Sequence, residues 1–310
     1  MAPPRGAAHR TLCAMIDGLA LLLQSPDQSP AAAGGGDGGW PLGEMIALGS
    51  LALLVAALLF PPTARRLRAL LPAREASGRL PVDAMVGVVG MAAFLLAGTI
   101  GATAAHLLGA TDDEYGRLLR GVCGNLLQCL VVVLLVSSRL FRDGPRKGSS
   151  AKLAIAAGAL SFVAVLPLVG AVGIIAGAVA EQFGLPRPPE VSHETLRILL
   201  EKGDTLFTLA TLAHVAVLVP VAEELGWRGV MQPTIRAAGA GPLVASALTA
   251  AIFAAIHWDA IPAGGRAVAM PMLVALGLAL GLLREKTGGV LAPIALHALF
   301  NAWNVAVTLA

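Results

Sequence analysis

The sequence predicts an all-α protein: a polytopic transmembrane helix bundle of about eight spans, with a candidate short helix before them. Three observations predict this fold. Hydrophobic residues make up 56% of the chain and charged residues only 13%, with a mean hydropathy of +0.78, which is far from the balance of a soluble domain. Apolar runs long enough to cross a bilayer recur along nearly the whole chain. The loops between these runs alternate in charge. One membrane-embedded unit therefore fits the 310 residues better than two soluble domains.

The first 40 residues differ from the rest of the chain. Arg5 and Arg10 precede an apolar run over residues 11–23, which falls short of the roughly twenty residues that a transmembrane helix needs. This run is either a signal-peptide-like segment or a short first helix. The low-complexity stretch from Ala31 to Gly39 is predicted to be a flexible linker.

Regular apolar runs begin after Trp40, and each is about as long as a bilayer crossing requires. The predicted spans are residues 43–60, 84–108, 121–138, 153–180, 205–231, 242–257, 267–283 and 290–309. Their many Gly and Ala residues suit close helix packing in lipid. Four spans contain a proline, which frees a backbone carbonyl and is expected to kink its helix beside a cavity. These are Pro167, Pro220, Pro271 and Pro293.

Basic residues concentrate in alternate loops. The loop over 61–83 holds five arginines and the loop over 139–152 holds three arginines and two lysines, whereas Asp112, Asp113 and Glu114 lie between them. The positive-inside rule then predicts four cytoplasmic loops, at 61–83, 139–152, 232–241 and 284–289. We expect an integral, multi-pass protein of the plasma membrane of a prokaryote. The net charge of +3 is too small and too scattered to indicate nucleic-acid binding.

The ionisable hexapeptide Glu223-Glu224-Leu225-Gly226-Trp227-Arg228 lies near the end of one predicted span. Charges in hydrocarbon are costly, so such residues indicate a functional site. Glu224 and Arg228 are four residues apart and can form an ion pair along a helix. Glu223 points about 100° away and has no local partner, which makes it a candidate general base, with Trp227 one turn below to exclude water. The alternative is that both acids join helices together or form a proton path.

Two further polar motifs lie in later spans. Phe253 and His257 are four residues apart and share a helix face, so the phenyl ring can pack on the imidazole. His297, Asn301 and Asn304 follow one stripe of the last span and need partners inside the bundle. Taken singly, these motifs are also explained by an interfacial histidine and by packing between helices.

A turn relates the first two motifs in space. Residues 239–242, rich in Gly and Pro, mark a turn between antiparallel helices. Glu223 lies fourteen residues before Ala237, and His257 lies sixteen residues after Gly241. At a rise of about 1.5 Å per residue, both lie roughly 21–24 Å from the turn. We therefore expect Glu223 and His257 to meet at one depth.

Other residue patterns exclude several classes of site. Cys13, Cys123 and Cys129 form neither a metal-ligand spacing nor an even disulfide set. The chain has no glycine-rich phosphate loop, no His-Glu-x-x-His zinc helix, and no serine or cysteine nucleophile set beside a base. His214, nine residues before Glu223, is on the opposite helix face and is predicted to pack within the bundle.

The three motifs together resemble those of the CPBP family of intramembrane proteases (also called ABI, or CAAX protease and bacteriocin processing), which is related to the type II CAAX prenyl endopeptidases. The family pattern is EExxxR, then FxxxH, then HxxxN, each on its own transmembrane helix. Here the motifs occur in that order as Glu223–Arg228, Phe253–His257 and His297–Asn301. Trp227 stands where the family has an aromatic residue, often Phe. The resemblance covers about 205–310, roughly the last third of the chain.

The resemblance implies an endopeptidase site. Glu223 and His257 would activate a water for attack on a peptide carbonyl, and His297 and Asn301 would hydrogen-bond the developing oxyanion. Donors aimed at that oxygen are worth on the order of 3 kcal/mol each.

The remaining motif residues would support this site. Glu224 and Arg228 would orient the helix and tune Glu223, with Phe253 and Trp227 beside them. The chain then divides into an N-terminal apolar segment and linker, N-terminal transmembrane helices, and a catalytic core, at residues 1–40, 41–204 and 205–310.

The family has also been described as metalloproteases. If zinc were bound, Glu223, His257 and His297 would be its ligands, with one position left for water. Asparagine is a poor zinc ligand, and the related prenyl endopeptidases favour a glutamate mechanism, so the resemblance favours no cofactor, with zinc as the alternative.

The resemblance also bears on partners. It implies a membrane-associated peptide or protein substrate, prenylated CAAX tails included, with the lipid bilayer as surroundings and no nucleic acid. The rival interpretation is a non-catalytic membrane protein, such as a transporter or an immunity factor, in which the acids carry protons or bind a partner.

Overall fold

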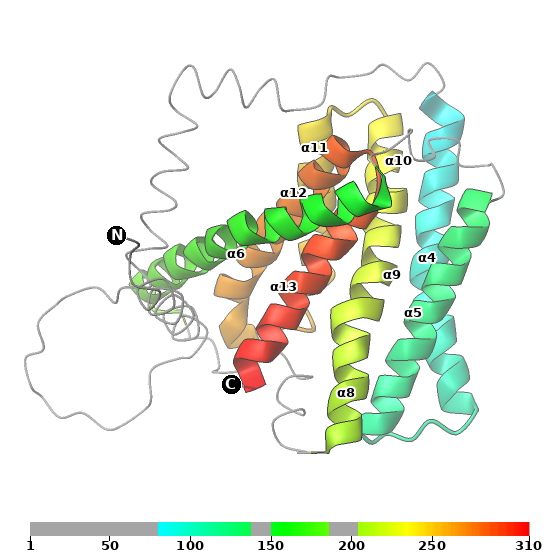
Figure 1. The fold of residues 1–310 in the computed structure, drawn as a ribbon, viewed down its shortest axis with the longest axis vertical. Coiled ribbons are helices and arrows are strands. Elements are labelled where there is room, and N and C mark those ends of the chain that lie inside the picture. Colours follow the sequence, from blue (N-terminus) through cyan, green and yellow to red (C-terminus); the bar gives the residue numbers. More distant parts are fainter. Residues whose placement is uncertain (1–79, 138–149, 186–203, 310) are drawn as a thin grey trace, which may run out of the picture.

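The computed structural model describes residues 80–137, 150–185 and 204–309. Within these ranges every secondary-structure element is a helix, and the helices pack into one bundle (Figure 1). Five helical segments of this part are long and apolar enough to cross a membrane. The prediction of an all-α polytopic bundle is confirmed. The predicted span 43–60, the predicted linker at 31–39 and the apolar run at 11–23 lie outside the described residues.

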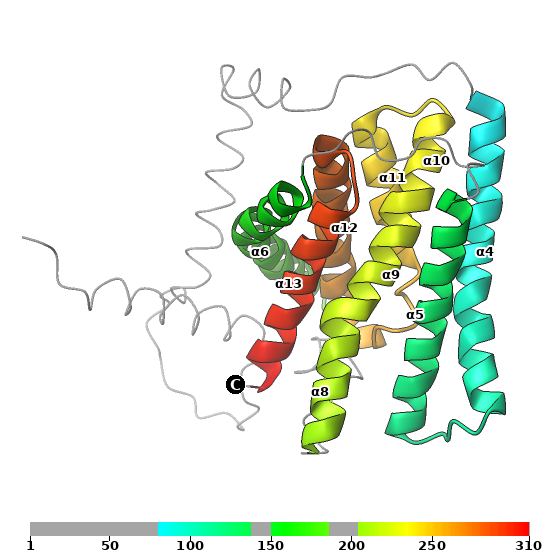
Figure 2. The same cartoon turned by 45° about the vertical axis from the view of Figure 1, so that its right-hand side comes forward.

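The first described pair of helices, α4 (Leu80–Leu107) and α5 (Glu114–Ser137), forms an antiparallel hairpin beside α9 and α10 (Figure 2). Glycines allow the two backbones to approach closely: a Cβ atom added to Gly124 would lie 2.8 Å from the carbonyl oxygen of Gly98. Close backbone packing of this kind is a usual means of helix association in a bilayer, because moving an apolar side chain from lipid into the protein gives little hydrophobic free energy.

Helix α5 begins at Glu114, so the predicted start at residue 121 is wrong. The prediction placed the start of the span after the last charged residue. The helix instead begins at a cap, because Oδ1 of Asp113 accepts the backbone N–H of Gly116 at 2.8 Å. Its first turns carry charge, including Arg117 and Arg120.

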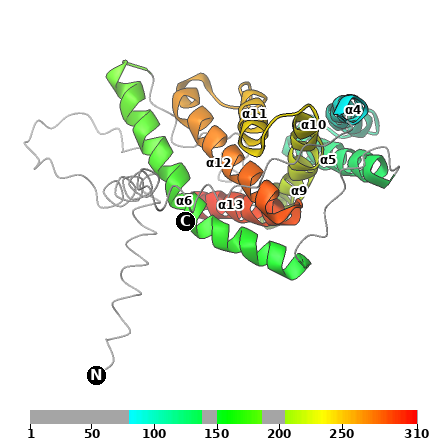
Figure 3. The same ribbon diagram turned by 90° about the horizontal axis from the view of Figure 1, so that it is seen from above.

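Helix α6 (Ala151–Gln182) agrees with the predicted span 153–180 and crosses the others at a steep angle (Figure 3). Its N-cap residue is Ser150, whose Oγ accepts a hydrogen bond from the backbone N–H of Leu153. The helix runs through Pro167 as one element and packs on α12 and α13. Their shared core is six buried residues: Val165, Val169, Leu276, Leu280, Leu296 and Phe300.

The next segment, residues 205–237, is one long helical rod that is interrupted twice by π-helical turns. The rod consists of α8 (Thr205–Ala213), η1 (His214–Leu218), α9 (Val219–Gly226), η2 (Trp227–Met231) and α10 (Gln232–Ala237). Each π turn ends two residues before a proline, Pro220 after η1 and Pro233 after η2. The predicted end at residue 231 is too early, because Gln232 and Arg236 are polar yet belong to the same rod.

The last helices are α11 (Pro242–Ala255), α12 (Arg266–Thr287) and α13 (Leu291–Leu309), with the 3-10 turn η3 (Ala263–Gly265) before α12. The predicted turn between α10 and α11 is confirmed, with Gly239 in the left-handed region at φ +94°. Helix α11 ends at Ala255, so His257 lies in the turn that follows rather than inside the predicted span 242–257. The predicted spans 267–283 and 290–309 agree with α12 and α13.

The prolines behave differently from one helix to the next. Pro271 lies inside α12 and borders a pocket of about 470 Å³, as predicted for a proline beside a cavity. Pro293 instead lies in the first turn of α13, where a helix leaves N–H groups unbonded in any case. The prediction that Pro293 frees a carbonyl within a span is therefore wrong.

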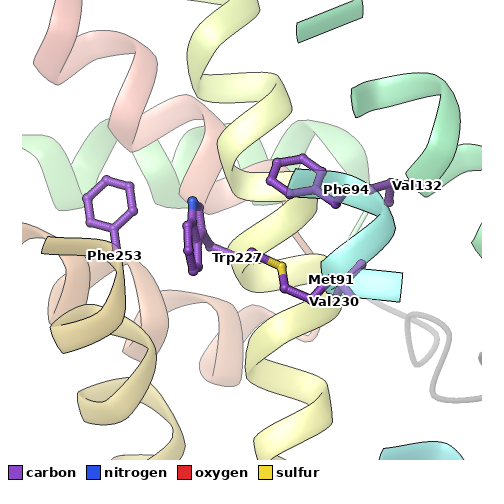
Figure 4. Packing of buried hydrophobic residues seen from close by; sticks show 6 residues of the cluster. All are labelled: Met91, Phe94, Val132, Trp227, Val230 and Phe253. Carbon is purple, nitrogen blue, oxygen red and sulfur yellow. The ribbon is translucent and has the colours of Figure 1, made fainter. Parts of the chain in front are cut away.

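A second apolar core joins the hairpin α4–α5 to the rod and to α11 (Figure 4). Its buried members are Met91, Phe94, Val132, Trp227, Val230 and Phe253. Trp227 packs edge-on against Phe253, with ring centroids 5.9 Å apart. The Phe253 ring also packs against the rings of His257 and His297, at 4.7 Å and 6.2 Å between centroids, so this core borders the candidate site.

Candidate active site

Glu223 lies between two imidazoles that come from different helices. Its Oε1 atom is 3.8 Å from Nε2 of His257, and its Oε2 atom is 3.8 Å from Nε2 of His297. The predicted meeting of Glu223 and His257 at one depth is confirmed. Both separations exceed a hydrogen-bond length, so they suit groups that share a small molecule such as water. The side chains of Glu223 and His257 are 20% and 23% exposed, which leaves this side of the cluster accessible.

His257 is held by the motif that precedes it. Its Nδ1 atom lies 2.7 Å from the carbonyl oxygen of Phe253, and the two rings pack at a tilt of 56°, with centroids 4.7 Å apart. A carbonyl oxygen can only accept, so Nδ1 carries the hydrogen. The neutral ring therefore presents the lone pair of Nε2 to Glu223.

Glu224 is completely buried and holds two other site residues through one oxygen. Its Oε1 atom accepts from Nη1 of Arg228 at 2.9 Å and lies 2.8 Å from Nδ1 of His297. The predicted pair Glu224–Arg228 is confirmed, whereas the contact between Glu224 and His297 was not predicted. The carboxylate of Glu224 accepts the hydrogen of Nδ1. The other ring nitrogen of His297, Nε2, is therefore left to face Glu223, as Nε2 of His257 does.

The cluster combines acidic, basic and imidazole groups. Glu224 pairs with Arg228, whereas Glu223 faces the Nε2 atoms of two imidazoles. A carboxylate oxygen and the lone pair of a neutral imidazole can each bind a proton. The arrangement can therefore accept a proton and release it again.

Arg228 is enclosed on all sides. It is 0% exposed, donates from Nη2 to the carbonyl oxygen of Gly277 at 3.0 Å, and lies 4.9 Å above the ring centroid of Phe253. The guanidinium is thus held by a carboxylate, a backbone carbonyl and an aromatic face. Such a group orients its neighbours rather than contacting a substrate.

Asn301 contacts the rod at a different point. Its Nδ2 atom donates to the carbonyl oxygen of Val215 in η1 at 2.9 Å. That carbonyl lacks its usual donor, since the N–H of Val219 bonds to His214 and the following residue is Pro220, which has no N–H. One of the two amide hydrogens of Asn301 therefore serves the backbone, a role that sequence reasoning missed.

The side chains predicted as zinc ligands lie together, since each carboxylate oxygen of Glu223 is 3.8 Å from an Nε2 atom, one of His257 and one of His297. Among the described residues, no group of three or more His, Cys, Asp or Glu side chains lies at metal-ligand spacing. Activity without a cofactor stays a prediction, with zinc as the alternative.

The remaining sequence predictions concern residues outside the site. His214 is bonded within the bundle, with Nε2 2.9 Å from Oδ1 of Asn125, as predicted for a packing residue. Cys123 and Cys129 are free and partly buried.

A buried polar stripe continues from Glu224 along the rod, and the sequence prediction missed most of it. Residues 228, 232 and 236 repeat every four positions after Glu224 and contact α12. Gln232 is 0% exposed and donates from Nε2 to Gly281 and to Glu285. The spacing of four, extended one turn beyond Arg228, is the signal that would have revealed it.

Residues 205–303 match the family model described as "Type II CAAX prenyl endopeptidase Rce1-like". The matched range contains all three motifs, from Glu223 to Asn301, so the resemblance inferred from the motifs is confirmed. No curated protein and no solved structure matches the chain.

Proposed function

Because residues 205–303 match the Rce1-like type II CAAX prenyl endopeptidases, we propose that the chain is an intramembrane endopeptidase. Its substrate would be a membrane-associated protein or peptide, with prenylated CAAX-type tails as the first class to test. The observation that carries this proposal is the position of Glu223, whose two carboxylate oxygens each lie 3.8 Å from the Nε2 atom of a histidine.

The first step is attack by water. A water between Glu223 and His257 donates one hydrogen to Oε1 and the other to the lone pair of Nε2. As its oxygen bonds to the peptide carbonyl carbon, the water gives a proton to Glu223. The C–N bond then breaks, and Glu223 returns this proton to the leaving amine. Atoms and charge balance without a covalent enzyme intermediate.

The second requirement is stabilisation of the oxyanion. His297 with the extra proton on Nε2 would donate there, while its Nδ1 stays bonded to Glu224. The second amide hydrogen of Asn301 is the other candidate donor, because the first is bonded to Val215. Preorganised donors of this kind contribute on the order of 3 kcal/mol each.

We favour the metal-free mechanism, because the chain matches the Rce1-like type II CAAX prenyl endopeptidases, and this resemblance favours a glutamate mechanism. The zinc-dependent version remains the alternative, since both imidazoles bond an acceptor through Nδ1, as metal-bound histidines often do. Metal content and chelator sensitivity of an active preparation separate the two versions.

The test is hydrolysis of a prenylated CAAX peptide by the purified protein in detergent, with the products identified by mass spectrometry. The wild type is expected to release the tail peptide, and His257→Ala to lose at least about 100-fold in rate. Asp112→Asn serves as the control, because its carboxylate is on the surface and pairs with Arg120 in the α4–α5 hairpin. Absence of cleavage by the wild type, or equal rates for both variants, would contradict the proposal.

A further inference from the structure

The two π turns of the rod each leave one backbone carbonyl without a donor. In η1 the N–H of Val219 bonds to His214, and in η2 the N–H of Gln232 bonds to Trp227. The next residue is a proline in both cases, and proline has no N–H. The carbonyls of Val215 and Arg228 therefore lose the donor that the π register would supply.

Side chains from the C-terminal helices donate to both carbonyls. Nδ2 of Asn301 in α13 lies 2.9 Å from the carbonyl oxygen of Val215, and Nε of Arg284 in α12 lies 3.1 Å from that of Arg228. An unbonded carbonyl at membrane depth is costly, so each donor stabilises the turn that it contacts. Asn301 belongs to the HxxxN motif, whereas Arg284 belongs to none of the three motifs.

We propose that Arg284 is a positioning residue for the proteolysis proposed above, acting through Arg228. Arg284 holds the backbone of Arg228, whose guanidinium holds Glu224 at 2.9 Å. Glu224 in turn lies 2.8 Å from Nδ1 of His297. A shift of η2 would thus reach the imidazole that faces Glu223.

The surroundings of Arg284 keep its guanidinium in place. Its Nη1 atom lies 3.3 Å from Oε1 of Glu285, a side chain that is only 5% exposed. The same carboxyl group accepts from Gln232 at 2.8 Å and lies 3.5 Å from Nε of Arg236. Gln232 therefore holds the same oxygen, Oε1, that Arg284 contacts, whereas Arg236 lies at the other oxygen, Oε2.

The packing register between the rod and α12 also supports this role of Arg284. Arg228 bonds to Gly277 and Gln232 bonds to Gly281, with the same offset of 49 residues. Helix α12 can present these carbonyls because glycine lets it approach α11: a Cβ atom on Gly277 would lie 3.0 Å from Cβ of Ala250. The contact between Arg236 and Glu285 continues this register with the same offset, and Arg284, one residue before Glu285, reaches the Arg228 carbonyl.

The experiment uses the full chain and a matched pair of variants. Arg284→Met removes the donor to Arg228, and Arg236→Met removes another arginine that contacts Glu285 but donates to the carbonyl of Ala240 instead. We expect Arg284→Met to lower kcat about 10- to 100-fold, the effect of one charged hydrogen bond, with KM within about twofold. Arg236→Met is expected to keep kcat within about threefold. Equal loss of kcat in both variants would overturn the proposal.

Pro233→Ala provides a second and more specific readout. It returns an N–H at the position that can donate to Arg228 in the π register, so the double variant Arg284→Met/Pro233→Ala is expected to recover most of the lost kcat. In thermal unfolding, the fall in Tm caused by Arg284→Met is expected to be smaller in the Pro233→Ala background. Equal falls in Tm in both backgrounds would overturn the proposal even if Arg284→Met is too unstable to assay.

The outcomes also separate this inference from the proposed function. Loss of activity in Glu223→Gln together with full activity in Arg284→Met would overturn only the role of Arg284. Full activity in Glu223→Gln would instead overturn the proposed catalytic mechanism, while the Tm comparison would still test the contact between Arg284 and the Arg228 carbonyl.

Discussion

The Nδ1 atom of His297 lies 2.8 Å from Oε1 of Glu224, a buried carboxylate that also pairs with an arginine on its own helix. This contact places the adjacent residues Glu223 and Glu224 in different environments. Glu224 is enclosed and bonded to cationic and imidazole donors, whereas Glu223 is partly exposed and faces two Nε2 atoms. The first is suited to hold the site together, and the second to exchange a proton with a water.

Glu224→Gln is therefore expected to destabilise the protein strongly. It leaves the buried guanidinium of Arg228 without its countercharge, and breaking a buried pair in this way costs about 3–5 kcal/mol. Thermal unfolding in detergent measures the effect. Glu223→Gln is the matched control, because the same change one residue earlier removes a partly exposed carboxylate and is expected to change Tm little. Equal Tm values for the two variants would refute the assigned division of roles.

Asn301→Ala tests whether Asn301 has one role or two. Loss of the bond to Val215 is expected to lower stability by about 1–3 kcal/mol, and loss of an oxyanion donor is expected to lower kcat by about 100-fold. Pro220→Ala restores an N–H beside the freed carbonyl, so it should recover stability in the Asn301→Ala background but not kcat. If kcat recovers together with Tm, then Asn301 acts only through the backbone of η1.

The metal-free mechanism predicts that zinc is dispensable. Metal analysis of an active preparation is expected to find well below one zinc per chain, and a chelator is expected to leave kcat unchanged, since Glu223 and His257 would activate the water themselves. A stoichiometric metal with chelator-sensitive turnover that zinc restores would establish the metalloprotease version instead.

Local patterns were sufficient to predict much of this fold. Runs of apolar residues placed α6, α12 and α13 to within a few residues, and the Gly and Pro residues at 239–242 placed the turn that brings Glu223 and His257 to one depth. These features depend on hydropathy and on turn chemistry, which act over a few residues. The start of α5 was missed because a cap at Asp113, not the end of the charged residues, decides where that helix begins.

The features that were not predicted depend on contacts between residues far apart in the sequence. Glu224 and His297 are 73 residues apart, and the partner of the Arg228 carbonyl is 56 residues away. A proline shows that a carbonyl is freed, but only the packed bundle shows which side chain bonds to it. The same reason explains Asn301, whose position on one stripe of α13 was predicted while its bond to Val215 was not.

The rate of peptide cleavage by Glu223→Gln tests the central claim most directly. The glutamine keeps the size of the side chain but cannot accept a proton from water, so kcat is expected to fall by at least about 100-fold while KM and Tm stay close to those of the wild type. Cleavage at the wild-type rate by this variant would contradict the claim that Glu223 activates the attacking water.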